Sequence, residues 1–572
     1  MALSSSVQAP IAERVKSLNP GDLVPSILWS LFLTAVVVGP WLGPGYLFGT
    51  DWPGPRRIDF PTEVSSSAGL QVVLALSSHA IGGEATGKLL VAGSLFAAGA
   101  LAYRAVPTRG FVAGALAATV YEVNPFVYGR LHYGQLYLLA GYAVLPWVTS
   151  RFRRLLQDPT PAAAIVAGAT LTLLGILSLH LLFASTVVLA ALVIAYFVGT
   201  KKRVEYLAKL IPSLVMTGGI TLAASSYWII PLLRGSGSEG SKLAGISGGD
   251  IAAFATVPDQ RYGLIPNLLG LYGFWAEATN RFTAMKAFAT LWPEALGCLL
   301  LISLIGVVAA LVQRRNRLAP WAAGLLAAAA VALILEMGVS HPATAGLVRW
   351  LDANIPLYKG MRDAGKWAAI LALAYSQLGA LGADVIMGWI AARIRFAAAR
   401  EWAGSLAAGL LLALALYYGN GLLFGAHGEI RPSAYPAGWY AADRVLSSDP
   451  KPDRTLFLPW HEYMSYSFIQ NQNKIVASPA PEFFSVPILA SQNPEVHGIP
   501  PPTDPDQVAI TALVRASGEG NWAQVLAGLH VKYVLVAKEF DWESYLYLDH
   551  RPGLVRIGDY GAIVLYRNSL LN

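Results

Sequence analysis

Residues 42–63 read LGPGYLFGTDWPGPRRIDFPTE and follow directly on the first long apolar run of the chain, about residues 25–45. The segment carries five charged side chains: Asp51, Arg56, Arg57, Asp59 and Glu63. Charges are costly inside a bilayer, so their position marks the point where a membrane span gives way to water. The segment therefore predicts a first span that ends here, followed by a loop that holds acids and arginines at the membrane face.

The composition of the whole chain indicates a membrane protein. Of its 572 residues, 55% are hydrophobic and only 13% are charged, and the mean hydropathy is +0.50, more apolar than a soluble globular protein can bury. The formal net charge is +7, but the basic residues lie in short clusters between apolar runs, the pattern that orients helices across a bilayer. We therefore expect no nucleic-acid partner. The single cysteine, Cys298, excludes an intramolecular disulfide.

Apolar runs of the length needed to cross a bilayer predict about 11 transmembrane helices. Eight of them are expected at about 25–45, 87–103, 110–127, 134–150, 181–199, 289–312, 367–390 and 402–424. The first has Arg14 and Lys16 ahead of it and no small-residue cleavage pattern, which predicts an uncleaved anchor. Segment 64–86 is interrupted by Ser, Gly and His79, so we expect it along the outer interface.

A basic cluster follows every even-numbered span, which places those ends in the cytoplasm. The clusters are Arg104 with Arg109; Arg151, Arg153 and Arg154; Lys201, Lys202 and Arg203; Arg314, Arg315 and Arg317; and Arg393, Arg395 and Arg400. The eleventh span then delivers the rest of the chain to the outer side. The prediction is a multi-pass protein of the plasma membrane.

The C-terminal part changes character from His427 onward, where charges and prolines become dense. Short β-like runs occur at 455–458, 531–536 and 562–566, and helical pieces at 439–446 and 507–516. This mixture predicts a small α/β domain. The expected organisation is a transmembrane domain over residues 1–425 and an extracytoplasmic α/β domain over residues 426–572.

Asp51 is the strongest candidate for chemistry, because a carboxylate at a span end usually faces a cavity or a partner. The alternative, a helix-ending Asp solvated at the interface, stays open. In glycosyl transfer with inversion, one carboxylate takes the proton of the attacking hydroxyl while positive charge stabilises the leaving phosphate. No cofactor is required for that chemistry. A divalent cation held by Asp51 with Asp59 and Glu63 also stays open, because oxygen-ligand sites have no tight spacing rule.

A second cluster occupies residues 124–135, NPFVYGRLHYGQ, where Pro125 and Gly129 are expected to break the helix. It offers donors at the outer face from Arg130, His132 and Gln135. Three interpretations of Arg130 stand side by side: it binds a lipid phosphate, it pairs with Glu122, or it reaches to the interface as a snorkelling side chain.

A third cluster, KGMRDAGKW at residues 359–367, precedes the tenth span. If Gly365 to Trp367 open that helix, its N-terminus offers positive partial charge beside Arg362 and Lys366, an anion site; simple topological anchoring is the alternative. Three further residues are candidates for lining a cavity or contacting substrate: His180, Glu336 and Trp275. Structural hydrogen bonding or interface anchoring would explain them as well.

These features resemble the GT-C superfamily of membrane glycosyltransferases, in which an Asp follows the first helix. The run from Tyr121 through Gln135 to Trp147 is similar to the N-terminal membrane region of mycobacterial arabinofuranosyltransferase D. Residues 362–367 and the run LHVKYVLV at 529–536 resemble YfhO-type membrane proteins. The resemblance implies a polyprenyl-phosphate-linked sugar donor and puts the catalytic base at Asp51. Many members carry two adjacent acids there, whereas here Trp52 follows, so a second acid would be Asp59 or Glu63.

The sequence thus predicts an inverting glycosyltransferase of cell wall biogenesis, which uses a polyprenyl-phosphate sugar to glycosylate an envelope glycan or glycolipid at the outer face. Asp51 would act as base, the C-terminal domain would orient the acceptor, and three cations would hold the donor phosphate: Arg362, Lys366 and Arg130. Two other classes stay open, a transporter or flippase of lipid-linked glycans and a non-catalytic assembly factor. The chain lacks two halves of matched hydropathy, which disfavours a transporter.

Overall fold

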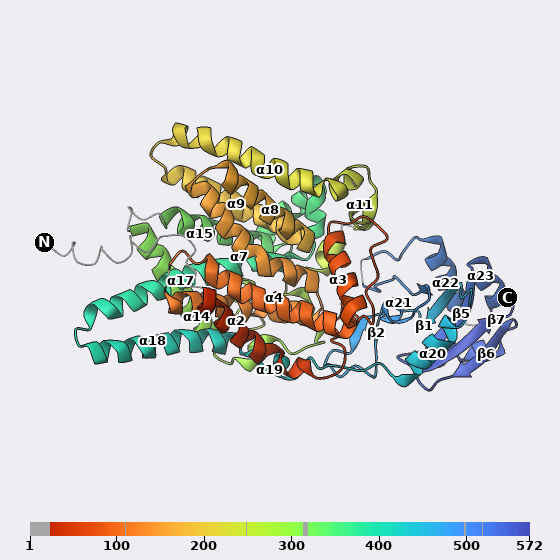
Figure 1. The fold of residues 1–572 in the computed structure, drawn as a ribbon. Helices are drawn as coiled ribbons and strands as arrows, with labels where there is room; N and C mark the ends of the chain where they lie inside the picture. The colour runs from red at the N-terminus through yellow and green to blue at the C-terminus, as the bar shows by residue number, and fades with distance from the viewer. Residues whose placement is uncertain are drawn as a thin grey trace.

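The computed structural model describes residues 23–108, 110–246, 249–312, 318–496, 499–516 and 519–571. It is a long helical bundle with a small α/β domain at one end (Figure 1). Six of the basic residues used to orient the helices lie outside the described residues: Arg14, Lys16, Arg109, Arg314, Arg315 and Arg317.

Each of the eight predicted spans coincides with a helix of the bundle. Among the described residues, eight helices are long and apolar enough to cross a membrane: α2 with the 3-10 turn η2 (Leu23–Leu42), α4 (Gly83–Ala105), α9 (Leu179–Gly199), α10 (Arg203–Leu233), α14 (Trp292–Val312), α15 (Ala319–Met337), η6 with α17 (Ala364–Arg393) and α18 (Ala397–Tyr418). Three shorter or less apolar helices also belong to the bundle: α5 (Phe111–Glu122) and α7 (Leu136–Gln157) lie at predicted spans, whereas α8 (Pro161–Leu177), like α10 and α15, lies where no bounds were predicted. The protein is therefore a polytopic helical membrane protein, as predicted.

Helix α17 (Ala368–Arg393) is the most enclosed span, and its small residues explain why. A Cβ added to Gly382 would lie 1.8 Å from the carbonyl oxygen of Ile302 in α14, and one added to Gly306 would lie 2.6 Å from the backbone nitrogen of Gly382. Small residues let the backbones of membrane helices approach closely, which increases their van der Waals contact. The tight α14–α17 contact fixes the helix that begins at the cationic cluster.

Shorter elements cover the end of the bundle nearest the α/β domain. Helix α3 (Ala68–Ile81) runs across the bundle axis there, in agreement with the expected interfacial course of segment 64–86 (Figure 1). The others are α6 (Pro125–His132), α11 (Gly237–Gly245), α12 (Asp250–Ala253), α13 (Leu264–Leu269), η3 (Trp275–Thr279), η4 (Met285–Phe288), α16 (Pro342–Asn354) and η5 (Pro356–Met361).

The expectation that Pro125 and Gly129 both break the helix is wrong for Gly129. Pro125 begins α6 at its first turn, where a missing N–H costs nothing, and Asn124 caps that end by accepting a hydrogen bond from Val127 N at 3.1 Å. Gly129 lies inside α6, where a Cβ would come within 3.1 Å of Phe274 Cδ1. It provides room for a packed ring rather than a helix end.

The C-terminal part is an α/β unit built on a five-stranded sheet of order β4-β1-β5-β7-β6. Strand β1 pairs in parallel with β4 and β5, while β7 is antiparallel to β5 and β6. A separate hairpin joins β2 to β3. The strands are β1 (Arg454–Leu458), β2 (Tyr463–Ser465), β3 (Ile475–Ala477), β4 (Ile488–Leu489), β5 (Val531–Ala537), β6 (Leu554–Asp559) and β7 (Ile563–Asn568).

Helices pack on both faces of this sheet, and each face has its own apolar core. The helices are α20 (Ala437–Ser447), α21 (Ala480–Phe483), α22 (Pro505–Arg515), α23 (Trp522–Gly528) and η8 (Trp542–His550). The three strands and two helices predicted in this part are present as β1, β5, β7, α20 and α22. The domain boundary at 425/426 stays a prediction; the chain passes it through η7 (Asn420–Leu422) and the short turn α19 (Leu423–His427).

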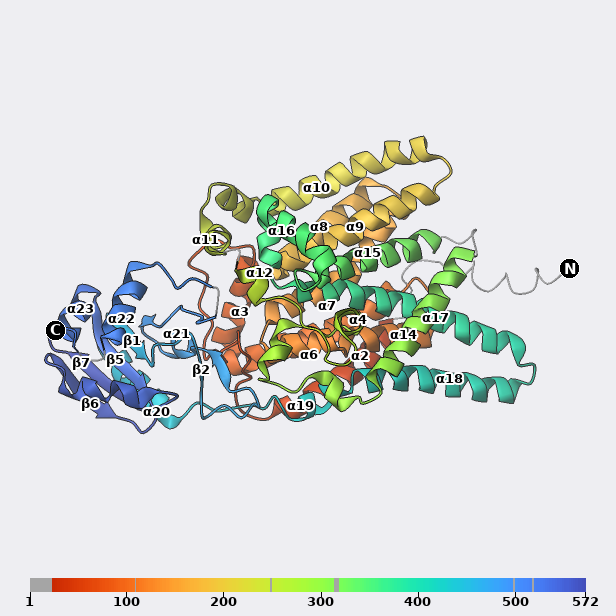
Figure 2. The same cartoon turned by 180° about the vertical axis from the view of Figure 1, so that it is seen from behind.

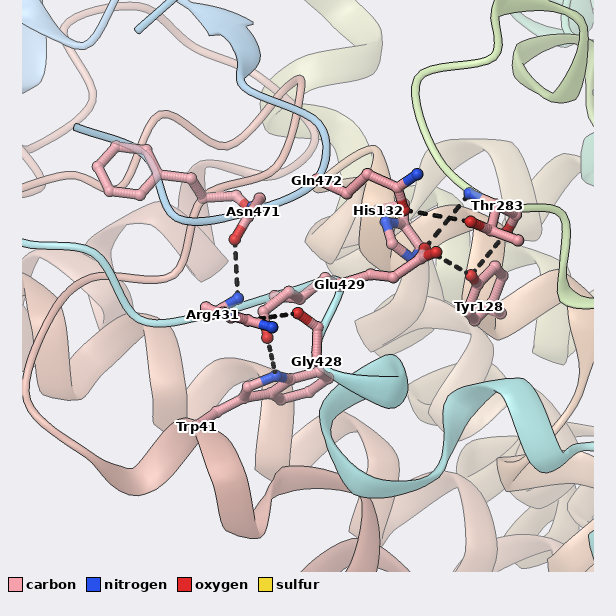
Figure 3. Close-up of polar contacts among 11 residues, drawn as sticks. Trp41, Tyr128, His132, Thr283, Gly428, Glu429, Arg431, Asn471 and Gln472 are labelled. Atoms are coloured by element: carbon pink, nitrogen blue, oxygen red, sulfur yellow. Dashed lines mark hydrogen bonds and ion pairs between the residues drawn. The ribbon is translucent and has the colours of Figure 1, made fainter. Parts of the chain in front are cut away.

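The α/β unit is tied to the bundle through Glu429, a buried carboxylate just after α19. It accepts hydrogen bonds from Tyr128 Oη at 2.9 Å and from Thr283 N at 3.4 Å, and His132 Nε2 lies 3.4 Å from it (Figure 3). Nearby, Trp41 Nε1 donates to the carbonyl of Ile430 at 2.9 Å. The linker is thereby fastened to α6 and to the end of the first span.

Candidate active site

The loop that carries Asp51 is a tight turn held against the bundle. Gly49 and Trp52 exchange backbone hydrogen bonds of 2.9 and 3.0 Å, which places Thr50 and Asp51 at the tip, and Asp51 N donates to Tyr133 O at 2.7 Å. A Cβ on Gly49 would lie 2.5 Å from Gly134 Cα, so this approach requires glycine. The turn between α6 and α7 thus fixes one side of the loop.

The α/β unit fixes the other side of the same loop. Asn473 Nδ2 donates to Thr50 Oγ1 at 2.9 Å, Ala477 N donates to Thr50 O at 2.8 Å, and Asn471 Nδ2 donates to Phe48 O at 2.8 Å. The ring of Phe48 is buried in the core of the α/β unit. Figures 1 and 2 show β2 on the side of that unit that faces the bundle.

Two hydrogen bonds hold the Asp51 carboxylate, one from each part of the protein. Tyr463 Oη donates to Oδ1 at 3.1 Å, and Gln135 Nε2 donates to Oδ2 at 3.3 Å. Surrounding protein atoms displace water and raise the pKa of Asp51, against the opposing effect of the two hydrogen bonds and the charges of Lys366 and Arg130. The side chain remains exposed, so it is a solvent-accessible carboxylate with raised basicity.

Arg130 stands behind this carboxylate. It is 1% exposed, forms an ion pair with Asp363, and donates from Nη1 to Gln135 Oε1 at 2.8 Å. Its guanidinium lies 4.1 Å from the centre of the Phe274 ring, a cation–π contact. Arg130 pairs with Asp363 and not with Glu122, whose Oε1 accepts from Thr34 Oγ1 at 2.7 Å. Arg130 is therefore an internal ion-paired residue that orients Gln135 toward Asp51, and it does not snorkel.

The cationic cluster lies at the start of the α17 span, where the sequence predicted a helix to open. Asp363 caps η6 by accepting from Gly365 N at 3.1 Å. Lys366 is buried and donates from Nζ to Gly360 O at 3.1 Å, while Arg362 is partly exposed and pairs with Asp250. Lys366 and Asp51 are close enough to influence each other electrostatically. The acid and the cations thus share one region.

An aromatic row links Asp51 to Arg362. Trp275 packs at 5.1 Å against the ring of Tyr133, whose carbonyl binds Asp51 N, and at 4.9 Å against Phe254. The Arg362 guanidinium lies 4.7 Å from the centre of the Phe254 ring. Trp275 therefore belongs to the same region as the catalytic candidates.

The other predicted residues divide into three groups. His180 borders the cationic cluster, beside Gly360, and Glu336 is buried near Arg130 and Asp363 with no hydrogen-bond partner for either carboxyl oxygen. His132 belongs to α6, and its side chain contacts Glu429.

The two acids near Asp51 in sequence lie away from it. Asp59 is exposed and pairs with Arg57 at 3.3 Å, and Glu63 is exposed as well. The structure shows no contact of Asp59 or Glu63 with Asp51 among the described residues.

Glu462 and Tyr463 are the residues that sequence reasoning missed. Burial and repulsion from Asp51 raise the pKa of Glu462 to about 7, so it is a second acid of this region. Both residues follow β1 after its carboxyl end, the edge where ligands bind in parallel α/β sheets. The polar run His461-Glu462-Tyr463 after a predicted strand was the available signal.

A metal site finds no direct support in this geometry. In the described ranges no group of three or more His, Cys, Asp or Glu side chains is arranged to hold a metal ion.

The sequence matches no known family model and no curated protein. Among solved structures, arabinofuranosyltransferase AftD from Mycobacteria superposes with a TM-score of 0.56 at 16% identity over 97% of this chain and 42% of that chain. Archaeoglobus fulgidus oligosaccharyltransferase AglB, in complex with an inhibitory peptide and a dolichol-phosphate, superposes with a TM-score of 0.42 at 14% identity over 96% of this chain and 74% of that chain. The apo oligosaccharyltransferase of that organism superposes with a TM-score of 0.38 at 13% identity over 90% of this chain and 69% of that chain. This chain thus spans less than half of the arabinofuranosyltransferase. The likeness to the arabinofuranosyltransferase, at a TM-score of 0.56, shows that the two chains share a fold.

Proposed function

We propose that the protein is an inverting glycosyltransferase that moves a sugar from a polyprenyl-phosphate carrier to an envelope glycan or glycolipid. The observation that supports this most is the meeting of an accessible carboxylate of raised pKa, Asp51, with Lys366 and Arg130 at the end of a GT-C-like bundle. A base and positive charge are the two groups that sugar transfer from a lipid phosphate needs.

In the proposed reaction Asp51 takes the proton of the acceptor hydroxyl. The acceptor oxygen attacks the anomeric carbon on the face opposite the phosphate, and the carbon–oxygen bond to the phosphate breaks with its electron pair on the phosphate oxygen. Arg362 and Lys366 stabilise the charge that develops there. Arg130, which is ion-paired with Asp363, adds positive charge near the site. It also donates to Gln135 Oε1 and so orients the Gln135 side chain toward Asp51.

The basic turns of the bundle support one orientation of the protein in the membrane. Lys201, Lys202 and Arg203 between α9 and α10, and Arg393 and Arg395 after α17, lie at the end of the bundle opposite the α/β unit (Figure 1). Lys and Arg are enriched in cytoplasmic loops. We infer that the α/β unit and Asp51 face the outer side of the plasma membrane.

The experiment measures transfer of radiolabelled sugar from a panel of polyprenyl-phosphate arabinose, mannose and glucose donors to envelope glycan fragments in proteoliposomes. Asp51→Asn is expected to insert and fold normally and to lose at least about 100-fold in rate, the scale of a general base. Asp453→Asn, an exposed Asp of the α/β unit at the amino end of β1, is the control. Normal transfer by Asp51→Asn would refute the proposal.

A further inference from the structure

A cavity of about 250 Å³ lies in the α/β unit, where η8 meets the strands β5, β7 and β6. The apolar part of its lining comes from Val536 and Val564 of the sheet and from Trp542 and Leu546 of η8. The lining contains none of the residues described above for the candidate active site. The cavity is therefore a second place in the protein where a small ligand can bind.

The charged part of the lining is electrically balanced. It consists of two cations and two carboxylates: Lys538, Arg556, Asp549 and Asp559. Lys538 Nζ lies 2.9 Å from Asp559, and Arg556 pairs with Asp559 and lies 3.5 Å from Asp549. A phosphate would meet no excess of positive charge here, and a metal ion no excess of negative charge. The lining therefore favours a neutral ligand.

The same lining suits a ligand that carries many hydroxyl groups. A hydroxyl both donates and accepts hydrogen bonds, so it can bind to a carboxylate as well as to Lys or Arg. Asp549 is exposed and accepts from Tyr566 Oη at 2.9 Å, which leaves further acceptor sites on its two oxygens. Lys538 Nζ lies 5.6 Å from the centre of the Trp542 ring, so an aromatic face stands next to these polar groups. A sugar ring, with an apolar C–H face and hydroxyl groups at its edge, matches this combination.

We propose that the cavity binds one neutral sugar residue of the acceptor glycan. Its volume lies below the roughly 300–1,000 Å³ of pockets that take drug-sized ligands, so it fits one ring rather than a longer oligosaccharide. Trp542 stacks on the apolar face of the ring, while Asp549 and Arg556 bind its hydroxyl groups. The binding of a sugar stands by itself, whereas the naming of that glycan as the acceptor rests on the proposed function.

The position of the cavity relates it to Asp51. Trp542 follows the carboxyl end of β5, as Tyr463 follows that of the parallel neighbour β1. The two segments are in contact, because His461 Nε2 lies 3.3 Å from Asp541 Oδ2. Tyr463 in turn donates to Asp51 at 3.1 Å. Ligands of parallel α/β sheets bind beyond the carboxyl ends of the strands, so a glycan anchored in the cavity lies on the edge of the sheet that reaches Asp51.

The first test measures binding in the absence of any donor. Neutral arabinan, mannan and glucan oligosaccharides are titrated into the purified full-length protein in nanodiscs and followed by calorimetry. At least one of them is expected to bind, and its phosphorylated counterpart to bind more weakly, because the cavity has no net positive charge. Failure of every neutral oligosaccharide to bind, or tighter binding of the phosphorylated form, would overturn the proposal.

Three variants change the cavity in different ways. Trp542→Leu removes the aromatic face, and Leu546→Trp fills space from a position that is 48% exposed, where a larger side chain does not strain the core. Each is expected to weaken binding of the neutral oligosaccharide by about tenfold, the upper scale of an aromatic contact. Asp549→Asn keeps the shape of the side chain but leaves the lining with a net positive charge. It is expected to shift the preference toward the phosphorylated oligosaccharide.

Each variant has a control of the same residue type outside the cavity. Trp402→Leu changes an exposed Trp of α18, Leu570→Trp an exposed Leu of the α/β unit, and Asp453→Asn an exposed Asp of that unit. All three are expected to bind as wild type does. Wild-type affinity in both Trp542→Leu and Leu546→Trp, or an unchanged preference in Asp549→Asn, would overturn the proposal.

Transfer kinetics separate this inference from the proposed function. If the bound glycan is the acceptor, Trp542→Leu raises KM for that acceptor by about tenfold with little change in kcat, the pattern of a contact made equally in the ground state and the transition state. Binding that is lost in Trp542→Leu, without transfer from any donor, would support the sugar site and refute the glycosyltransferase. Transfer with the same acceptor KM in wild type and Trp542→Leu would refute the cavity as an acceptor site and leave the glycosyltransferase standing.

Discussion

Arg130 and Asp363 form an ion pair across 233 positions of sequence, and both side chains are buried. The pair joins α6, which leads to Gln135 and Asp51, to the turn that carries Lys366. It is therefore the contact that brings the acid and the cations of the candidate site together.

Removal of one partner leaves a buried uncompensated charge. Arg130→Met or Asp363→Leu alone is expected to destabilise the protein by about 3–5 kcal/mol, and the double variant to recover much of that loss. Thermal unfolding in nanodiscs measures the stability of each variant. The control is Arg57→Ala, which breaks an exposed pair worth about 0–1 kcal/mol. Single variants as stable as Arg57→Ala would contradict a structural role for the pair.

The raised pKa of Asp51 links stability to pH. A carboxyl group whose pKa is higher in the folded than in the unfolded state binds more protons when folded, so its ionisation costs folding free energy as the pH rises. Asp51→Asn is therefore expected to melt at a higher temperature than wild type at pH 7, with a difference that shrinks at acidic pH. Melting curves from pH 4 to pH 8 measure this, and a variant less stable than wild type at pH 7 would contradict it.

The contact of Gly49 with Gly134 predicts a positional effect on catalysis. A Cβ at Gly49 would lie 2.5 Å from the Gly134 backbone, so Gly49→Ala must shift the Asp51 turn. Displacement of a catalytic group by about 1 Å can cost about 100-fold in rate. The comparison is Gly43→Ala in the same loop, where no atom lies within 4 Å of the new methyl group. Equal transfer rates in the two variants would show that the turn does not position the base.

Arg362 is the partly exposed cation of the cluster. Arg362→Gln is expected to lower kcat/KM for the lipid-phosphate donor by about 10- to 100-fold, the scale of a hydrogen bond to a charged group. Steady-state kinetics with varied donor measure it. Arg261→Gln, an exposed arginine of the loop before α13, serves as control. If the two variants behave alike, Arg362 does not contact the donor.

Glu429 joins the linker to α6 (Figure 3). Glu429→Ala leaves the buried groups of Tyr128 and His132 without this partner, at a cost of about 1–3 kcal/mol. The variant is expected to melt earlier and to be cut faster by protease near residue 428 than Glu543→Ala, an exposed control. Unchanged proteolysis would show that other contacts hold the linker.

The bundle could be predicted from sequence because each span is a local property, an apolar run of sufficient length. The helix start at the cationic cluster and the strands β1, β5 and β7 could be predicted for the same reason, because their signals also lie in short stretches of sequence. Gly129 was misread because the ring that needs its space, Phe274, is distant in sequence. Tyr463 and Glu462 were missed for the same reason: nothing in a hydropathy pattern specifies which distant loops meet. Asp59 and Glu63, near Asp51 in sequence, point to solvent instead.

The turn that holds Asp51 depends on partners made very late in synthesis. Asn471 and Asn473 bind Phe48 and Thr50, each 423 positions earlier. The last long helix of the bundle, α18, ends at Tyr418, so all the long helices are synthesised before the residues that close this turn. A chain that stops before residue 471 therefore lacks both of these contacts, and the Asp51 turn is held from the bundle side alone.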